Sequence, residues 1–440
     1  MRKRKNLNIK LTKTIKERRN IMKIQHDLVI IGAGPAGMAA AVSAYDEGIK
    51  DVVIIERDVA PGGILQQCIH NGFGLHKLGK ELTGPEYAAV YAKKVQERGI
   101  KVYYSTMVLS INKDKEVRAQ NSTDGIITFS AKAIILAMGC RERSRGALNI
   151  PGSRPAGVYS AGTAQKLINC EGYAVGKKAV ILGSGDIGLI MARRMTFEGA
   201  KVEAVCEIMP YSGGLVRNIV QCLEDYDIPL YLSHTVSQIH GKKRVEGVTI
   251  AQVDENKNPI PGTERYIECD TLLLSCGLIP ENELTSAAGI TLDGITKGAV
   301  VNQDRQTETE GIFSCGNVLQ VHDLVDYVSD EAELAGKGAA KYIRGENNYN
   351  GYLEVKASGG VRYVLPQKIS LPVSEDVALF MRVTQPFGKV KIFALDEDGN
   401  VLASKISLKA APGEMEKLVL KKSVLENVKG TIKVTLEEMN

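Results

Sequence analysis

Apolar and polar positions follow two different patterns along the chain, and the change falls near residue 350. Before it, short apolar runs such as Leu28–Ile31 and Val52–Ile55 are separated by helix-forming stretches, which predicts buried strands alternating with helices. After it, apolar residues recur at every second position, as in the run 432–436, which predicts half-buried strands. We therefore expect an α/β protein with a β-rich C-terminal domain.

The first strand–helix–strand unit contains a glycine motif. Gly32, Gly34 and Gly37 form G-x-G-x-x-G directly after the first apolar run, and the next strand ends at Glu56. In such a unit the glycines permit a tight turn, a close approach of the backbone to a pyrophosphate, and packing of the helix on the strand. The helix N-terminus faces the phosphates and the acid accepts hydrogen bonds from a ribose. The unit predicts a dinucleotide site.

The same unit recurs later in the chain, with Gly183, Gly185, Gly188 and Glu207 in the same places. The spacing from first glycine to acid is identical, since 56 − 32 and 207 − 183 both give 24. The alternative, a decayed structural repeat, is disfavoured because every element is intact. Two complete motifs predict two bound dinucleotides.

Glu207 also indicates which dinucleotide binds at the second motif. A carboxylate at this position accepts from a ribose 2′-hydroxyl and repels a 2′-phosphate. The following stretch, IMPYS, has no basic residue to neutralise that phosphate. The sequence therefore predicts NAD(H) rather than NADP(H).

The net charge of +5 is concentrated in one segment. Residues 1–21 hold nine Lys/Arg and one Glu, which contribute +8, so the remaining chain carries 5 − 8 = −3. We interpret this segment as a disordered arm or as sequence before a true start at Met22; contact with nucleic acid or a membrane is the alternative. No apolar run reaches the roughly 18 residues of a membrane helix, so we expect no integral membrane segment. We also expect no nucleic-acid partner.

Eight cysteines are present and none forms C-x-x-C. This argues against a zinc knuckle, an iron–sulfur cluster or a thioredoxin-type dithiol, and we expect no metal site. Without an export signal, the cysteines are expected to be reduced thiols in the cytoplasm.

The order of motifs resembles flavoproteins of the two-dinucleotide-binding-domain class, which includes the pyridine nucleotide–disulfide reductases. The strand ending in Ala137-Met138-Gly139, the returning strand with Gly277, and the stretch with Gly316 and Asn317 all match this class. The resemblance covers residues 22–346. It implies FAD at the first site and NAD(H) at the second, with hydride passing between them.

The resemblance also implies a domain plan. The FAD-binding domain would be discontinuous, over 22–152 and 269–346, with the NAD-binding domain of 153–268 inserted. Residues 351–440 lie outside the resemblance; their period-two pattern predicts a β-sandwich-like domain, which we interpret as a docking or interface module. The residues expected to bind the two cofactors are Gly32, Gly34, Pro35, Ala36, Gly37, Glu56, Arg57, Gly62, Gly63, Ala137, Gly139, Gly183, Gly185, Asp186, Gly188, Glu207, Gly277, Gly316 and Asn317.

Two departures from the class are visible. Asn317 stands where the class usually has an Asp that binds the ribityl chain; an amide still accepts and donates hydrogen bonds, so FAD binding is expected to survive. The redox cysteine pair is also missing from both of its known positions, which here hold only Cys68 and Cys170. The stretches GGILQQCIHNGFG, GCRERSRGALNIPG and PYSGGLVRNIVQCL resemble the alpha subunits of opine oxidase, hydrogen cyanide synthase and amino-acid dehydrogenase complexes, and a flavoprotein associated with glycerol-3-phosphate dehydrogenase.

Three residues are candidates for catalysis. Cys68 and His70 lie in PGGILQQCIHNGFG, either as a thiol with its base or as packed residues lining the site. His322 precedes a helix whose N-terminus, by resemblance, points at the flavin; it is a candidate proton donor or cation, or else a capping residue. Among the arginines at 141, 143 and 145, one is a candidate for a hinge or phosphate contact.

The function predicted from the sequence is an FAD-dependent, NADH-linked oxidoreductase, acting as the flavoprotein component of a multi-subunit dehydrogenase. Its partner would be a substrate-oxidising or electron-accepting subunit, with a homo-oligomer as a further option. One alternative is a self-contained NADH oxidase or peroxide reductase that uses Cys68. The other is a dinucleotide-binding sensor or assembly subunit with little turnover.

Overall fold

The structure, a computed structural model, describes residues 22–439. The interpretation of the basic segment 1–21 lies outside these residues. No helix in the described part of the chain is both long enough and apolar enough to cross a membrane.

The first half of the chain builds a seven-stranded sheet in the order β5-β2-β1-β8-β7-β6, with β19 paired to β8. The central pairs β1–β2, β1–β8 and β8–β19 are parallel. Because β19 comes from far along the chain, the sheet gains its last strand only after a long intervening segment that forms other sheets. Its strands are β1 (Met22–Ile31), β2 (Val52–Ile55), β5 (Lys101–Tyr103), β6 (Met107–Ile111), β7 (Glu116–Asn121), β8 (Gly125–Leu136) and β19 (Ile312–Ser314).

Three helices accompany this sheet, α2 (Pro35–Asp46), α3 (Gly84–Glu97) and α9 (Val325–Ile343). Helices α2 and α9 pack closely at Gly336, where an added Cβ would lie only 2.5 Å from the Ala40 carbonyl oxygen. Nine residues of α2 are buried, which explains why this helix is Ala-rich rather than amphipathic. We refer to this sheet and its helices as the flavin half, after the cofactor that the sequence predicts for it.

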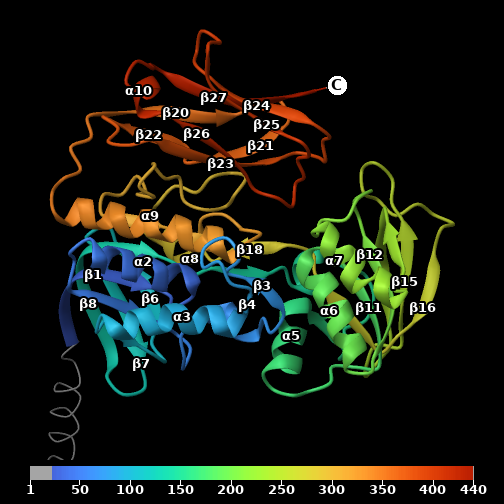
Figure 1. The fold of residues 1–440 in the computed structure, drawn as a ribbon. Coiled ribbons are helices and arrows are strands. Elements are labelled where there is room, and N and C mark those ends of the chain that lie inside the picture. Colours follow the sequence, from blue (N-terminus) through green and yellow to red (C-terminus); the bar gives the residue numbers. More distant parts are fainter. Residues whose placement is uncertain (1–21, 440) are drawn as a thin grey trace, which may run out of the picture.

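The intervening segment forms a second parallel sheet in the order β10-β17-β11-β12-β13 and a three-stranded sheet β14-β15-β16. We refer to this part as the nucleotide half (Figure 1). Its elements are β10 (Val158–Ser160), α5 (Ala161–Asn169), β11 (Lys178–Leu182), α6 (Asp186–Phe197), β12 (Lys201–Glu207), α7 (Val216–Cys222), η2 (Glu224–Tyr226), β13 (Leu230–Leu232), β14 (His234–His240), β15 (Gly247–Gln252), β16 (Arg265–Glu268) and β17 (Thr271–Leu274).

The two halves are joined by a short antiparallel pair, β9 with β18. The chain leaves the flavin half along β9 and returns along β18. The remaining short elements are η1 (Gly63–Gln67), β3 (Asn71–Phe73), β4 (Leu82–Thr83), β9 (Cys140–Glu142), α4 (Arg145–Leu148), β18 (Leu278–Pro280), α8 (Glu283–Ala287) and η3 (Gly316–Val318).

The C-terminal region forms two facing sheets, β22-β20-β27-β24-β25 and β21-β23-β26. The expected β-sandwich is confirmed and has eight strands within the described residues, and the turn at 396–400 joins β24 to β25 as an antiparallel pair. Its elements are β20 (Gly351–Ala357), β21 (Val361–Leu365), β22 (Lys368–Leu371), β23 (Val377–Val383), β24 (Val390–Leu395), β25 (Val401–Ser407), β26 (Glu416–Leu420), α10 (Lys422–Leu425) and β27 (Thr431–Glu438).

The sandwich lies on the α9 side of the flavin half (Figure 1). Side chains join them: Ser370 N donates to Gln303 Oε1 at 2.8 Å, and Lys341 in α9 pairs with Glu375 at 3.3 Å. Leu365 of β21 is fully buried within a core cluster made mostly of residues of the flavin half. The sandwich is therefore part of the same packed body rather than an appended module.

Candidate functional site

The turn between β1 and α2 is shaped by its glycines. Gly32 has φ of 104°, and a Cβ there would lie 2.5 Å from Ala137 O. A Cβ at Gly37 would lie 1.8 Å from Gly32 O. In contrast, within residues 22–439 no atom beyond the local backbone lies within 4 Å of the Cβ position at Gly34. The turn is tightly packed on one side and open at its middle glycine, beside the N-terminus of α2.

Other predicted segments converge on this turn. Gly62 N donates to Ala33 O at 2.8 Å, and the Cβ position of Gly63 is 3.3 Å from Gly34 Cα. Gly316 lies on another side, where a Cβ would be 2.7 Å from the Ala36 side chain. Asn317, the next residue, reaches Cys140 with Nδ2 3.7 Å from Sγ. Three segments distant in sequence, around residues 62, 137 and 316, therefore lie against the glycine turn and the start of α2, where Pro35 occupies the first turn.

The turn between β11 and α6 repeats this geometry. Gly183 has φ of 102°, and a Cβ there would lie 2.1 Å from Ser275 O. A Cβ at Gly188 would lie 2.5 Å from Gly183 O, whereas Gly185 has only Ser275 Oγ near its Cβ position, at 3.9 Å. Gly277 follows with φ of 98° and open space around it.

The two strand-terminal acids make equivalent contacts. Glu56 accepts from Ala33 N at 2.6 Å and from Asp58 N at 2.8 Å. Glu207 accepts from Ser184 N at 2.9 Å and from Met209 N at 3.0 Å. In each case one oxygen holds the second residue of the glycine turn and the other holds the residue two positions beyond the acid. Both acids are buried at the edge of their turns.

Two further predicted residues behave differently. Asp186 Oδ1 accepts from Leu215 N at 2.8 Å and from Asn218 Nδ2 at 2.6 Å, so its carboxylate anchors the segment before α7 to the second turn. Arg57 is exposed just after Glu56.

Comparison with known proteins identifies the family. A model of the pyridine nucleotide-disulphide oxidoreductases matches residues 26–336. The chain belongs to this family. Its members are FAD- and NAD(P)-dependent oxidoreductases, so the chain is a flavoprotein oxidoreductase of this type.

Individual relatives are distant. The chain is 25% identical over 337 residues to an opine oxidase subunit of Agrobacterium tumefaciens, covering 72% of this chain and 64% of that protein's length. It is 26% identical to thioredoxin reductase of Listeria monocytogenes, covering 72% and 94%. The crystal structure of T. acidophilum thioredoxin reductase superposes with a TM-score of 0.59 at 25% identity, over 73% of this chain and 98% of that one. These matches support the two Rossmann-like units.

The first turn fits the family's FAD. Within the described residues, Gly34 and Gly139 have open space at their Cβ positions, which leaves room for a ligand against the backbone. Asp326, in the first turn of α9, is 2% exposed, and its Oδ1 has no hydrogen-bond partner within the described residues. An unpaired buried carboxylate oxygen is costly unless another group completes the site. The second turn offers the same arrangement to a nicotinamide nucleotide.

The side chains of Cys68 and His70 contact different groups in this structure. The nearest polar partners of Cys68 Sγ are Ile64 O at 3.3 Å and Gln165 Oε1 at 3.9 Å. Burial raises the pKa of this thiol to about 12. The His70 ring instead packs against Phe73, with centroids 5.1 Å apart. Burial lowers the pKa of His70, and the nearby Arg217 adds to this shift.

His322 lies in a buried polar network. Its side chain is 2% exposed, with Nδ1 3.4 Å from Asn317 Oδ1 and Nε2 3.4 Å from Glu331 Oε2. Burial lowers the pKa of His322, while Glu331 and Asp323 oppose the shift. Glu331 Oε2 also accepts from Gly316 N at 3.1 Å. The structure thus connects His322 to the Gly316–Asn317 turn and separates it from Cys68 and His70.

The arginines after β8 have structural partners. Arg141 pairs with Glu281 and Glu283 at 2.7 Å each, and the Arg145 guanidinium donates to the Ser153 carbonyl. Arg143 donates from its backbone N to Gly277 O at 3.1 Å. These contacts hold the crossing between the two halves.

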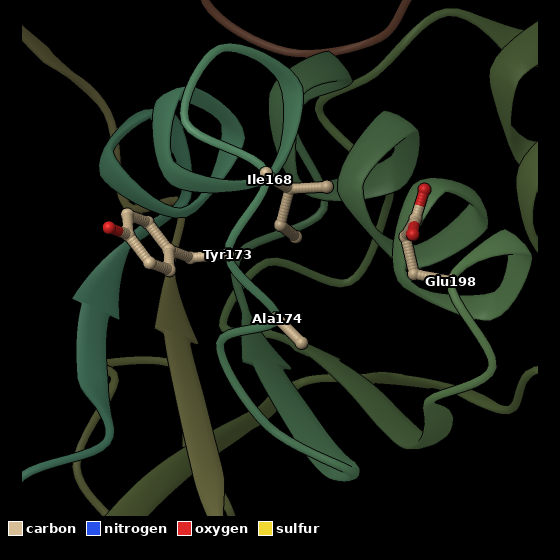
Figure 2. Close-up of a pocket in the computed structure, with 5 residues that line it drawn as sticks. Ile168, Tyr173, Ala174 and Glu198 are labelled. Atoms are coloured by element: carbon tan, nitrogen blue, oxygen red, sulfur yellow. The ribbon is translucent and has the colours of Figure 1, made fainter.

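A separate cavity of about 110 Å³ lies at the outer end of α5. Figure 2 shows Ile168, Tyr173, Ala174 and Glu198 around it. Its lining shares no residue with either glycine turn. Within residues 22–439, no group of three or more His, Cys, Asp or Glu side chains is arranged to bind a metal.

Sequence reasoning missed Glu331 and Arg305. Both are 1% exposed, with Arg305 Nε 3.3 Å from Glu331 Oε1. A signal for Glu331 exists: it falls within the stripe of Val328, Ala332 and Ala335, which packs inward along α9. A charged residue on the apolar stripe of a helix indicates a buried partner. Arg305 lies in a loop and has no comparable signal.

Proposed function

We propose that the chain is the flavoprotein component of a multi-subunit, NADH-linked dehydrogenase. Bound FAD would supply the hydride chemistry, and the protein would bind and orient the two nucleotides. The observation that carries the proposal is the equivalence of the two glycine turns, each with its acid bonded to the second turn residue. Such a pair suits a protein that passes electrons between two nucleotides.

The residues that would hold FAD are those around the start of α2. Gly34 and the N-terminus of α2 would face the pyrophosphate, and Glu56 would face the ribose. Asn317 would contact the ribityl chain. Gly185 and Glu207 would take the corresponding places for NADH, and Glu207 favours the 2′-hydroxyl over a 2′-phosphate.

The role within a larger complex is supported by the way electrons would leave. All eight cysteines are free, and the thiol of Cys68, with its pKa raised to about 12, stays protonated at neutral pH. A nucleophilic or redox-active cysteine needs the thiolate. This disfavours the self-contained enzyme that uses Cys68. The similarity to a protein named as one subunit of an opine oxidase favours a partner as electron acceptor or donor.

Anaerobic mixing of the purified FAD-loaded protein with NADH tests the proposal. We expect bleaching of the visible flavin band, then slow reoxidation by oxygen or peroxide. Adding the protein that co-purifies with the chain from its source cells, together with that protein's substrate or acceptor, should accelerate reoxidation of the flavin. An unbleached flavin would support the sensor alternative. Reoxidation by oxygen or peroxide at turnover rate, without a partner, would support the self-contained enzyme.

A further inference from the structure

Among the contacts between the sandwich and the flavin half, one arginine holds the segment that precedes α9. Arg382 of β23 donates from Nη2 to Val321 O at 3.0 Å, and the same nitrogen lies 3.4 Å from Asp323 Oδ1. Its Nη1 donates to Pro412 O at 2.9 Å. Asp323 also accepts from Met415 N at 3.4 Å, so both of its oxygens face the sandwich. The side chains of Arg382 and Asp323 are 12% and 9% exposed.

The segment held by Arg382 contains the flavin-side residues. His322 N donates to Asn317 Oδ1 at 3.0 Å, which closes the segment from Gly316 to Asp323 on itself. From inside the flavin half, Glu331 holds the same segment through Gly316 N and His322 Nε2. The segment is thus fixed from two sides, by Glu331 of α9 and by Arg382 of the sandwich.

Strand β23 is suited to this contact by its alternation. Val377, Leu379, Met381 and Val383 face the core of the sandwich. The intervening residues project from the opposite face of the strand, toward the flavin half. There the Phe380 ring lies 5.7 Å from the Arg305 guanidinium, which in turn pairs with Glu331. Phe380 and Arg382 therefore meet the polar network at two points.

We infer that Arg382 is a positioning residue for the flavin site, which holds the Gly316–Asp323 segment and thereby the contacts of Asn317 with FAD. The inference rests on the proposed placement of FAD at this turn. Removing the guanidinium leaves the Asp323 carboxylate and the Val321 carbonyl buried without their partner, a costly state that the segment relieves by moving. The sandwich then acts as a third part of the flavin site.

Titration of the FAD-free protein with FAD, followed by fluorescence, tests this directly. We expect Arg382→Ala to weaken FAD binding by about tenfold or more, the scale of a lost charged hydrogen bond. Arg382→Lys keeps the charge but not the forked guanidinium, so its FAD affinity should lie between those of the wild type and Arg382→Ala. Asp323→Asn should weaken binding in the same direction, and it keeps the inference testable if Arg382→Ala does not fold. The midpoint potential of the bound flavin, from reductive titration, should shift in the same variants.

Lys417→Ala is the matched control. Lys417 is exposed on β26 and lies 5.6 Å from the same Phe380 ring, but its cation contacts neither Val321 nor Asp323 in the described structure. Its FAD affinity and flavin potential should match the wild type. Unchanged affinity and potential in Arg382→Ala, or equal losses in Lys417→Ala, would overturn the inference. Neither measurement uses NADH, so a wild-type flavin that NADH does not bleach contradicts the proposed function alone.

Discussion

Arg305 and Glu331 form an ion pair in the interior of the protein, with Nε 3.3 Å from Oε1 and both side chains almost fully buried. The pair is not alone, since Gln320 Nε2 donates to Glu331 Oε1 at 2.8 Å. Burial lowers the pKa of Arg305, and the charge of Glu331 opposes that shift. A buried charge is tolerated only while its partner is present.

Neutralising one partner should therefore be expensive. We expect Glu331→Gln to lower the free energy of unfolding by about 3 kcal/mol, because it leaves the Arg305 charge uncompensated. Glu333→Gln, two residues along α9, removes a half-exposed pair with Lys77 and should cost about 1 kcal/mol or less. Urea unfolding of the two variants gives the comparison, and equal losses would contradict the role assigned to Glu331.

A second prediction concerns the contact between the sandwich and the nucleotide half. A Cβ at Gly413 would lie 2.7 Å from Gly213 O. Gly213 belongs to the segment bonded to the second turn, where Ser212 Oγ donates to Ser184 O at 3.0 Å. Gly413→Val should displace this segment and weaken NADH binding several-fold, while FAD affinity stays unchanged.

The control for that experiment is Gly388→Val, also in the sandwich, where no atom of the described residues beyond the chain neighbours lies within 4 Å of the Cβ position. Neither glycine has a positive φ, so backbone strain does not separate the two variants. NADH affinity measured by titration should fall only for Gly413→Val. A similar fall in both would mean that the sandwich responds as a whole and that the Gly413–Gly213 contact is unimportant.

The third prediction concerns the reactivity of Cys68. With a pKa of about 12, only about one thiol in ten thousand is ionised at pH 8, and alkylation should speed up about tenfold per pH unit from there toward pH 11. Iodoacetamide at pH 8 should modify the exposed Cys170 well before Cys68, as read by peptide mass spectrometry. Cys68→Ser should retain NADH-driven flavin reduction. Rapid labelling of Cys68, or loss of flavin reduction in the variant, would restore the thiol-based alternative.

The fourth prediction concerns nucleotide choice. NADH should reduce the flavin faster than NADPH, because the Glu207 carboxylate repels a 2′-phosphate. Glu207→Gln should weaken NADH binding by roughly tenfold or more, since hydrogen bonds to charged groups contribute about 1.5–3 kcal/mol. Glu203→Gln on the same strand, where Glu203 pairs with Lys201, should leave the preference intact. Faster reduction by NADPH in the wild type would contradict the assignment.

The parts of the fold that were predicted depend on local patterns. Both glycine turns follow an apolar strand and open a helix, so their geometry is encoded within about 30 residues of sequence. The alternation in β27 likewise revealed a half-buried strand. These patterns needed no knowledge of distant partners.

The rest depends on contacts between distant segments. Strand β23 reads as a nearly continuous apolar run, VALFMRV, because the sandwich core covers one of its faces and the flavin half the other. The spacing of Cys68 and His70 left their roles open, because the surroundings of the His70 ring, with Phe73 against it and Arg217 of the nucleotide half nearby, depend on tertiary packing. The pairing of Arg305 with Glu331 spans a loop and a helix, which no periodicity connects.

The pairing of β19 with β8 sets an order for biosynthesis. Every strand of the nucleotide half leaves the ribosome before Ile312–Ser314, so that half can close while the first sheet still lacks a strand. The flavin turn at Gly316 and its anchor at Arg382 emerge later still. The proposed FAD site is therefore complete only after β23 has been synthesised, and a chain interrupted before β23 would hold a finished nucleotide half beside an unfinished flavin half.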